Sequence, residues 1–124
     1  MWTISKEFHF SASHVLKGLE EGHPCGNLHG HNYVLRLILV GKPNEDGFVL
    51  DYRKLAFVKE FVDSKLDHKH LNDVFEFQTS VENMSKYLYD LFKPTIPQLY
   101  GVEMSETPKT KCLYSPFIAT NQQW

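Results

Sequence analysis

Three histidines and one cysteine lie within nine residues of the chain, at His23, Cys25, His29 and His31. His29 and His31 are two positions apart and directly precede the apolar run Tyr33 to Val40. If that run belongs to a β-strand that begins at His29, both imidazoles point to the same side, because side chains alternate along a strand. Two imidazole nitrogens on one face would provide two ligands for a metal ion.

A third ligand is available at His14, which closes the alternating segment Phe10-Ser11-Ala12-Ser13-His14. An H-x-H pair on a strand is about as often a surface pair or a hydrogen-bonded pair as a ligand pair. The upstream histidine, the nearby Cys25 and the glycines favour the metal site. Three histidines with an open fourth position are typical of catalytic zinc. We therefore expect His14, His29 and His31 to bind Zn²⁺.

The two cysteines have different surroundings. Cys25 lies among glycine and histidines, where a nearby cation would favour the reactive thiolate. Cys112 precedes the apolar pair Leu113-Tyr114 and is more simply explained by core packing. A disulfide between them is the weaker alternative, because a reducing cytosol disfavours it.

Length and composition indicate one globular domain, residues 1–124, with a core but no room for a second domain. The net charge of −2 and the absence of a Lys/Arg run argue against a nucleic-acid partner. No apolar segment approaches the roughly 20 residues that span a bilayer, so no membrane partner is expected. The N-terminus does not have the pattern of a secretory signal, and we expect a cytoplasmic protein.

The first half of the chain alternates as strands do. Trp2 to Phe10 places apolar side chains on one parity and polar ones on the other, which predicts a half-buried strand. The glycines and proline of Val15 to Pro24 predict a loop. Asn32 to Val40 is apolar on both parities and predicts a strand covered on both faces. A further short strand is predicted at Phe48 to Leu50.

Two helices are predicted next. Asp51 is placed to cap a helix over Tyr52 to Leu66, whose apolar residues recur at intervals of three and four. Thr79 and Glu82 have the spacing of a capping box before a second amphipathic helix that ends at Lys93. Either of these two side chains could touch a ligand, although capping is sufficient to explain them.

The last elements are strands. Val102 to Thr107 alternates, Pro108-Lys109-Thr110 forms a turn, and Lys111 to Ile118 is a final strand before a frayed tail at Thr120 to Gln123. Glu106 falls on the apolar parity of its strand. A carboxylate there is either desolvated for a purpose or reaches back to solvent, and we favour the functional alternative.

Asp67 and His68 are adjacent where the first helix ends. A carboxylate next to an imidazole suits proton transfer, because it raises and steadies the basicity of the ring. The alternative is a polar helix exit. A second H-x-H, His68 and His70, is a poor metal site because Lys69 lies between the rings. The residues leave open which of these two histidines matters.

Taken together, the motifs resemble the 6-pyruvoyl-tetrahydropterin synthase family over nearly the full length, and most closely its 6-carboxy-5,6,7,8-tetrahydropterin synthase branch. Three residues separate Cys25 from His29, as in that branch, whereas the animal pyruvoyl enzymes usually have a longer gap. A third variant uses a glutamate nearer the histidines, where this chain has Asn27 and Leu28. The resemblance is carried by FSASH at 10–14, CGNLHGHNY at 25–33, GFVLDY at 47–52, LDH at 66–68, TSVEN at 79–83 and Glu106-Thr107.

The resemblance implies an α+β tunnelling fold, with an antiparallel four-stranded sheet and two helices on one face. In that fold subunits join their sheets into a β-barrel, typically a homo-oligomeric hexamer of two trimers with active sites at subunit interfaces. Such an assembly would also bury the uncovered sheet face and the two sheet edges.

By resemblance, the activity is that of a zinc-dependent lyase that converts 7,8-dihydroneopterin triphosphate to 6-carboxy-5,6,7,8-tetrahydropterin, acetaldehyde and triphosphate, in 7-deazapurine (queuosine) biosynthesis. Cys25, Asp67, His68 and Glu106 would be catalytic, with Glu106 also gripping the pterin and Thr79 a further substrate contact. Two alternatives are triphosphate elimination alone, giving 6-pyruvoyl-tetrahydropterin, and a non-catalytic zinc-binding or pterin-binding protein.

Overall fold

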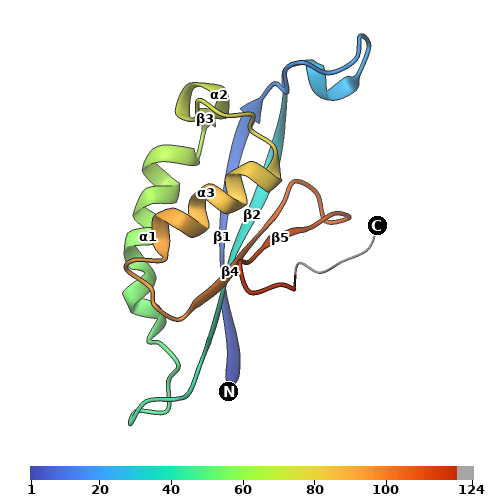
Figure 1. Ribbon diagram of the computed structural model, residues 1–124. Helices are drawn as coiled ribbons and strands as arrows, with labels where there is room; N and C mark the ends of the chain where they lie inside the picture. The colour runs from blue at the N-terminus through green and yellow to red at the C-terminus, as the bar shows by residue number, and fades with distance from the viewer. Residues whose placement is uncertain (120–124) are drawn as a thin grey trace.

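The centre of the fold is a long antiparallel hairpin of β1 (Trp2–His14) and β2 (His29–Gly41), seen in the computed structural model, which describes residues 1–119 (Figure 1). The strands pair over their whole length, from Trp2 opposite Gly41 to His14 opposite His29. The expected alternation is present, and one side chain in two faces the core. These buried residues are Phe8, Phe10, Ala12, Tyr33, Leu35, Leu37 and Leu39.

The sheet has the strand order β3-β1-β2-β4-β5. Beyond β2 it continues antiparallel through β4 (Leu99–Ser105) and β5 (Cys112–Tyr114). The predicted α+β class with four antiparallel strands is therefore confirmed. A fifth strand, β3 (Lys69–His70), adds a short parallel pairing with β1 at Ala12 and Ser13.

The helices cover one face of this sheet (Figure 1). The predicted helix at 52–66 is helical throughout, as η2 (Tyr52–Leu55), α1 (Ala56–Phe61) and the π-turn η3 (Val62–Leu66). As predicted, Asp51 caps this segment by accepting a hydrogen bond from a backbone N–H at position 53. A short α2 (Leu71–Val74) and the longer α3 (Val81–Phe92) follow.

Four details of the sequence prediction are wrong. No strand forms at 48–50, where the buried Val49 packs into the core without strand pairing. β5 ends at Tyr114 instead of continuing to residue 118, and β4 already begins at Leu99. Ser80, rather than Thr79, is the N-cap of α3. The tail predicted at 120–123 lies outside the described residues.

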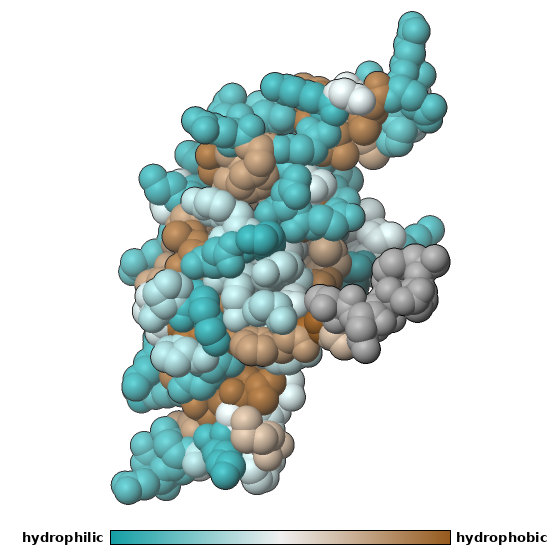
Figure 2. Space-filling view, in the orientation of Figure 1, coloured by the Kyte–Doolittle hydropathy of each residue, from teal (hydrophilic) through white to brown (hydrophobic). Residues whose placement is uncertain are grey.

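The helical side of the molecule is mainly polar at its surface, with apolar groups visible in the lower half of the view (Figure 2). Among residues 1–119, no helix combines the length and the apolar character that a bilayer crossing would need. The helices and the sheet instead bury their apolar faces against each other.

Candidate metal centre

The three predicted ligand histidines meet at one end of the central hairpin. His14 is the last residue of β1 and pairs with His29, the first residue of β2, while His31 lies two positions further along β2. Because β-strand side chains alternate, His29, His31 and Tyr33 project from the same face of β2. This is the face that packs against the helices.

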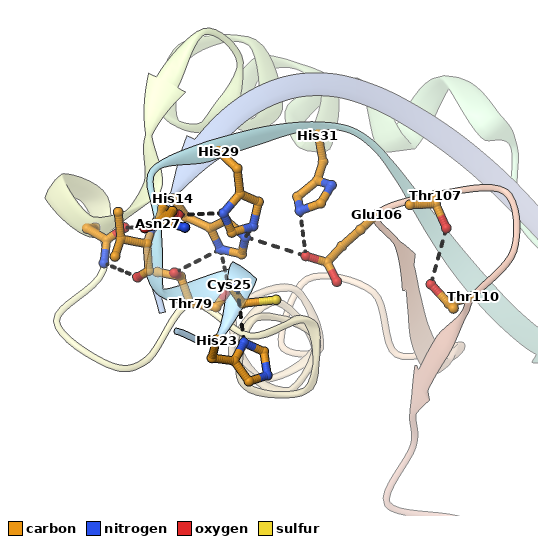
Figure 3. Close-up of polar contacts among 12 residues, drawn as sticks. His14, His23, Cys25, Asn27, His29, His31, Thr79, Glu106, Thr107 and Thr110 are labelled. Atoms are coloured by element: carbon orange, nitrogen blue, oxygen red, sulfur yellow. Dashed lines mark hydrogen bonds and ion pairs between the residues drawn. The ribbon is translucent and has the colours of Figure 1, made fainter. Parts of the chain in front are cut away.

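The three rings converge (Figure 3). One potential ligand nitrogen from each of the three histidines lies within 4.8 Å of the others. The Nε2 atoms of His14 and His29 are 3.0 Å apart. The His31 ring centroid lies 5.3 Å from that of His14 and 4.9 Å from that of His29. The arrangement places three imidazoles around one small volume.

Hydrogen bonds on the far side of two rings fix which nitrogen faces this volume. The Nδ1 of the fully buried His14 donates to the Thr79 carbonyl oxygen at 2.9 Å, and the Thr79 hydroxyl lies 3.1 Å from the same nitrogen. The Nδ1 of His29 donates to the Asn27 carbonyl oxygen at 2.7 Å. With their protons on Nδ1, both neutral rings turn the lone pair of Nε2 inward. Such outer contacts orient metal-binding histidines in general.

Burial keeps two of these rings neutral. It lowers the pKa of His14, an effect that the hydrogen bond to Thr79 partly opposes. Burial also lowers the pKa of His31, against the opposing attraction of the Glu106 carboxylate. Neutral imidazole is the form that coordinates a metal, so both rings are in the binding form near pH 7.

The donor atoms fit a divalent metal. The Nε2 atoms of His14 and His29 lie 3.0 Å apart. Their inward-facing lone pairs repel each other unless a cation or a shared proton lies between them. The Nε2 of His31 is buried and has no hydrogen-bond partner among residues 1–119, although a Glu106 oxygen is 3.1 Å away. Three imidazole nitrogens with no thiolate are the ligand set of a catalytic zinc site.

Glu106 follows directly after β4 and reaches the cluster from the His31 side (Figure 3). Its Oε2 lies 3.1 Å from the Nε2 of His31 and 3.5 Å from the Nε2 of His14. The parity noted in the sequence is thus realised, with Val102 and Met104 buried and the carboxylate turned to the same side. Tyr33, fully buried, packs its ring against His31, and burial raises the pKa of its phenol.

Cys25 lies in the short 3₁₀-helix η1 (Pro24–Gly26) that leads into β2. Its backbone N–H donates to Nδ1 of His23 at 3.0 Å, and its carbonyl accepts from Leu16 N–H at 3.0 Å. Figure 3 draws Cys25 together with His23, the partner of its backbone N–H. Cys25 is half-buried and free, as is Cys112 on β5. The loop that carries the thiol is therefore tied to the chain two residues beyond His14.

Two amide side chains hold the start of that loop. Asn72 accepts from Val15 N–H at 2.8 Å and donates to the Val15 carbonyl at 2.9 Å. Gln78 accepts from Lys17 N–H at 3.0 Å and donates to its carbonyl at 2.8 Å. Together with Thr79, these residues fasten α2 and the segment between α2 and α3 to the end of β1 and the chain that follows it.

Asp67 and His68 lie elsewhere, at the edge of β1. The Asp67 carboxylate accepts from Ser11 N–H at 2.9 Å and lies 3.0 Å from Nδ1 of His68, and the backbone bond is the main cause of its lowered pKa. The His68 side chain is 83% exposed and its φ is +59°, in the left-handed region. Within residues 1–119 neither side chain bonds to the histidine cluster. His70 instead bonds to Ser13, with Nδ1 3.0 Å from the hydroxyl.

The structure thus brings together His14, His29, His31, Glu106 and Thr79, and it separates the Asp67-His68 pair from them. The sequence reasoning missed Tyr33 and the two amide clamps. Tyr33 could have been found, since it continues the period of two that places His29 and His31. The clamps have no local signal, because they join residues more than fifty positions apart.

Comparison with known proteins gives a family match over most of the chain. The family model described as 6-pyruvoyl tetrahydropterin synthase matches residues 3–116. The chain is 39% identical over 120 residues to the 6-pyruvoyl tetrahydrobiopterin synthase of Dictyostelium discoideum, covering 85% of this chain and 89% of that one. It is 30% identical over 130 residues to the 6-carboxy-5,6,7,8-tetrahydropterin synthase of Bacillus subtilis, covering 91% and 84%.

The fold is shared with solved structures. The 6-pyruvoyl tetrahydropterin synthase of Caenorhabditis elegans superposes with a TM-score of 0.80 at 30% identity, covering 92% of this chain and 94% of that one.

Proposed function

The chain belongs to the 6-pyruvoyl tetrahydropterin synthase family, and from that premise we propose that it is a zinc-dependent lyase acting on 7,8-dihydroneopterin triphosphate. The products would be 6-carboxy-5,6,7,8-tetrahydropterin, acetaldehyde and triphosphate, with uptake of water. Residues 1–124 would act as one domain. The family membership supports a pterin synthase, and the choice of products rests on the spacing of Cys25 and His29.

One observation carries the proposal: three inward-facing imidazoles meet at the end of a hairpin whose connecting loop holds a free thiol. His14, His29 and His31 would hold Zn²⁺. When bound, the metal supplies Lewis acidity that lowers the pKa of substrate hydroxyls and stabilises developing oxyanion charge. The buried Thr79 and the Asn27 carbonyl would keep two of the rings aligned for this task.

Cys25 would act as the base that removes a proton from a carbon of the substrate side chain. A thiolate is the reactive form, and a nearby cation favours it. The electron pair left on carbon can then move toward the pterin ring, which ends in its tetrahydro form. The hydrogen bonds that fix the backbone of Cys25 support a positioned base rather than a packing residue.

Asp67 and His68 would move the second proton, with the carboxylate orienting Nδ1 of the imidazole and leaving Nε2 free. Because His68 is exposed and held at the sheet edge, we propose that it serves the metal centre of a neighbouring subunit. Backbone groups on the outer edge of β1 that have no strand partner among residues 1–119 support such an assembly. Within the described residues, β1 has a partner on its outer edge only at Ala12 and Ser13.

The assembly would join these edges into a barrel, and the family resemblance implies a hexamer of two trimers. An exposed strand edge is otherwise a liability for aggregation. Exposed aromatic side chains at Trp2 and Phe117 add apolar surface that a neighbouring subunit could cover.

Glu106 would bind the amino and ring N–H groups of the pterin, because a carboxylate offers two acceptor oxygens to two donors. A direct contact of Thr79 with the substrate stays a prediction, since both of its oxygens lie near His14. The product would serve 7-deazapurine (queuosine) biosynthesis in the cytosol.

Product analysis by mass spectrometry tests the proposal. Incubation with 7,8-dihydroneopterin triphosphate is expected to release acetaldehyde and 6-carboxy-tetrahydropterin in equal amounts. A 6-pyruvoyl product without acetaldehyde would instead support the second candidate, triphosphate elimination alone, which the name of the Dictyostelium relative favours. Pterin binding and zinc content without turnover would indicate a non-catalytic binding protein.

A further inference from the structure

The carboxylate of Glu106 has an unusual set of neighbours for an acidic side chain. Its Oε2 lies 3.1 Å from the Nε2 of His31 and 3.5 Å from the Nε2 of His14, two atoms that the proposed function assigns to the metal. Within residues 1–119 these histidines are its only ion-pair partners, and neither a lysine nor an arginine is among them. The negative charge is therefore directed at the metal centre.

A nearby glutamate, Glu103, shows that the orientation of Glu106 is not shared by every carboxylate in this part of the chain. Glu103, on β4 three residues before Glu106, faces the opposite side of the sheet and lies 3.6 Å from the Arg36 guanidinium. Within the part of the chain that the structure describes, Glu106 forms no ion pair with a lysine or arginine, and its side chain is 27% exposed. A partly desolvated carboxylate without a cationic partner is costly, unless a cation occupies the space that it faces.

We infer that Glu106 is the fourth ligand of the metal in the resting protein and leaves it when a pterin binds. This inference rests on the proposed function. It assigns the Glu106 carboxylate to the metal first and to the pterin afterwards. Three histidines leave one position of a tetrahedral zinc site open, and a carboxylate oxygen is an accepted ligand there. The same oxygens are then needed by the N–H groups of the pterin.

The exchange couples the two binding events. A carboxylate that contacts the metal only when the pterin is absent stabilises the metal only in that state. Linkage then requires the pterin to weaken metal binding by the factor by which the metal weakens pterin binding. The position vacated by Glu106 becomes free for the hydroxyls of the substrate at the moment when the ring arrives.

Chelator competition measures the zinc affinity of the protein without substrate. Glu106→Gln is expected to weaken binding at least about tenfold, the scale typical of altered metal surroundings. Glu103→Gln, the same change three residues earlier in the chain, is expected to leave the affinity unchanged. Glu106→Asp, which keeps the charge on a shorter side chain, is expected to recover part of the affinity and guards against a folding defect of the glutamine variant.

A second arm uses pterin itself, which lacks the hydroxylated side chain and so offers the metal no hydroxyl. Saturating pterin is expected to lower the zinc affinity of the unmodified protein to that of Glu106→Gln, and to have no effect on the variant. Wild-type zinc affinity in Glu106→Gln, or an affinity of the unmodified protein that pterin does not change, would overturn the inference. The proposed function would survive either result, whereas it would fail if the unmodified protein bound no zinc.

Discussion

The Nδ1 of His14 donates a hydrogen bond to the carbonyl oxygen of Thr79, 65 residues away in the chain. This bond crosses from the helix side to the last residue of β1 and decides which nitrogen of the ring faces the histidine cluster. The hydroxyl of Thr79, 3.1 Å from the same nitrogen, adds a second acceptor. Thr79 itself is fully buried.

Thr79→Val removes this hydroxyl with little change of shape. The carbonyl bond to His14 remains, and we expect zinc affinity to fall about tenfold, the lower end of the usual effect of such outer contacts. Thr79→Ser keeps the hydroxyl and is expected to retain most of the affinity. Chelator competition on both variants measures the difference. Equal affinities would show that the carbonyl alone positions the ring.

His29→Ala is expected to abolish stoichiometric zinc binding, because it removes one of three ligands and leaves two imidazoles around the site. His9→Ala is the matched control. His9 lies on β1 with its side chain 68% exposed, and its only ion-pair partner among the described residues is Glu7. Elemental analysis of the purified proteins gives the metal content. A full complement of zinc in His29→Ala would exclude this residue as a ligand.

Cys25→Ala is expected to retain zinc and to lose a factor of about 10² to 10⁴ in kcat, the usual contribution of a positioned base. The loss belongs to kcat, because the thiolate acts on the reacting carbon rather than on binding. Cys112→Ser is the control, since Cys112 lies on β5 outside the cluster. Steady-state kinetics measure kcat for each variant. An equal kcat for the Cys25 variant and the unmodified protein would show that the thiol has no part in the reaction.

Mixing two inactive variants tests the shared active site. If His68 serves the centre of a neighbouring subunit, co-refolded Cys25→Ala and His68→Ala chains form some sites that contain both native residues. If equal amounts assemble at random in a ring of identical contacts, about a quarter of all active sites contain both native residues. Activity is therefore expected to return to about a quarter of that of the unmodified protein. A mixture as inactive as its components would instead indicate that His68 acts within its own chain.

The alternation of the first forty residues was enough to predict the hairpin and the common face of His29 and His31. Period two is a local property, and it holds wherever a strand is half-buried. The same reasoning placed Glu106 on the inner parity of its strand. It could not give the distance of this carboxylate from His31, because that depends on the register between β2 and β4.

Other features of the fold could not be predicted from local patterns in the sequence. β3 is two residues long and exists because Lys69 and His70 pair with the end of β1. The apolar run around Val49 was predicted as a strand. The segment is irregular, yet the side chain of Val49 still reaches the core. The location of Asp67 and His68 relative to the thiol is a tertiary property, and adjacency in the chain gives no information about it.

Turnover by metal-free and zinc-restored protein tests the central claim most directly. The protein is stripped with a chelator, divided, and incubated with 7,8-dihydroneopterin triphosphate with and without one equivalent of Zn²⁺, and acetaldehyde is measured over time. We expect acetaldehyde release only in the restored sample. Equal release by the stripped protein would contradict the assignment of the three histidines to a catalytic metal.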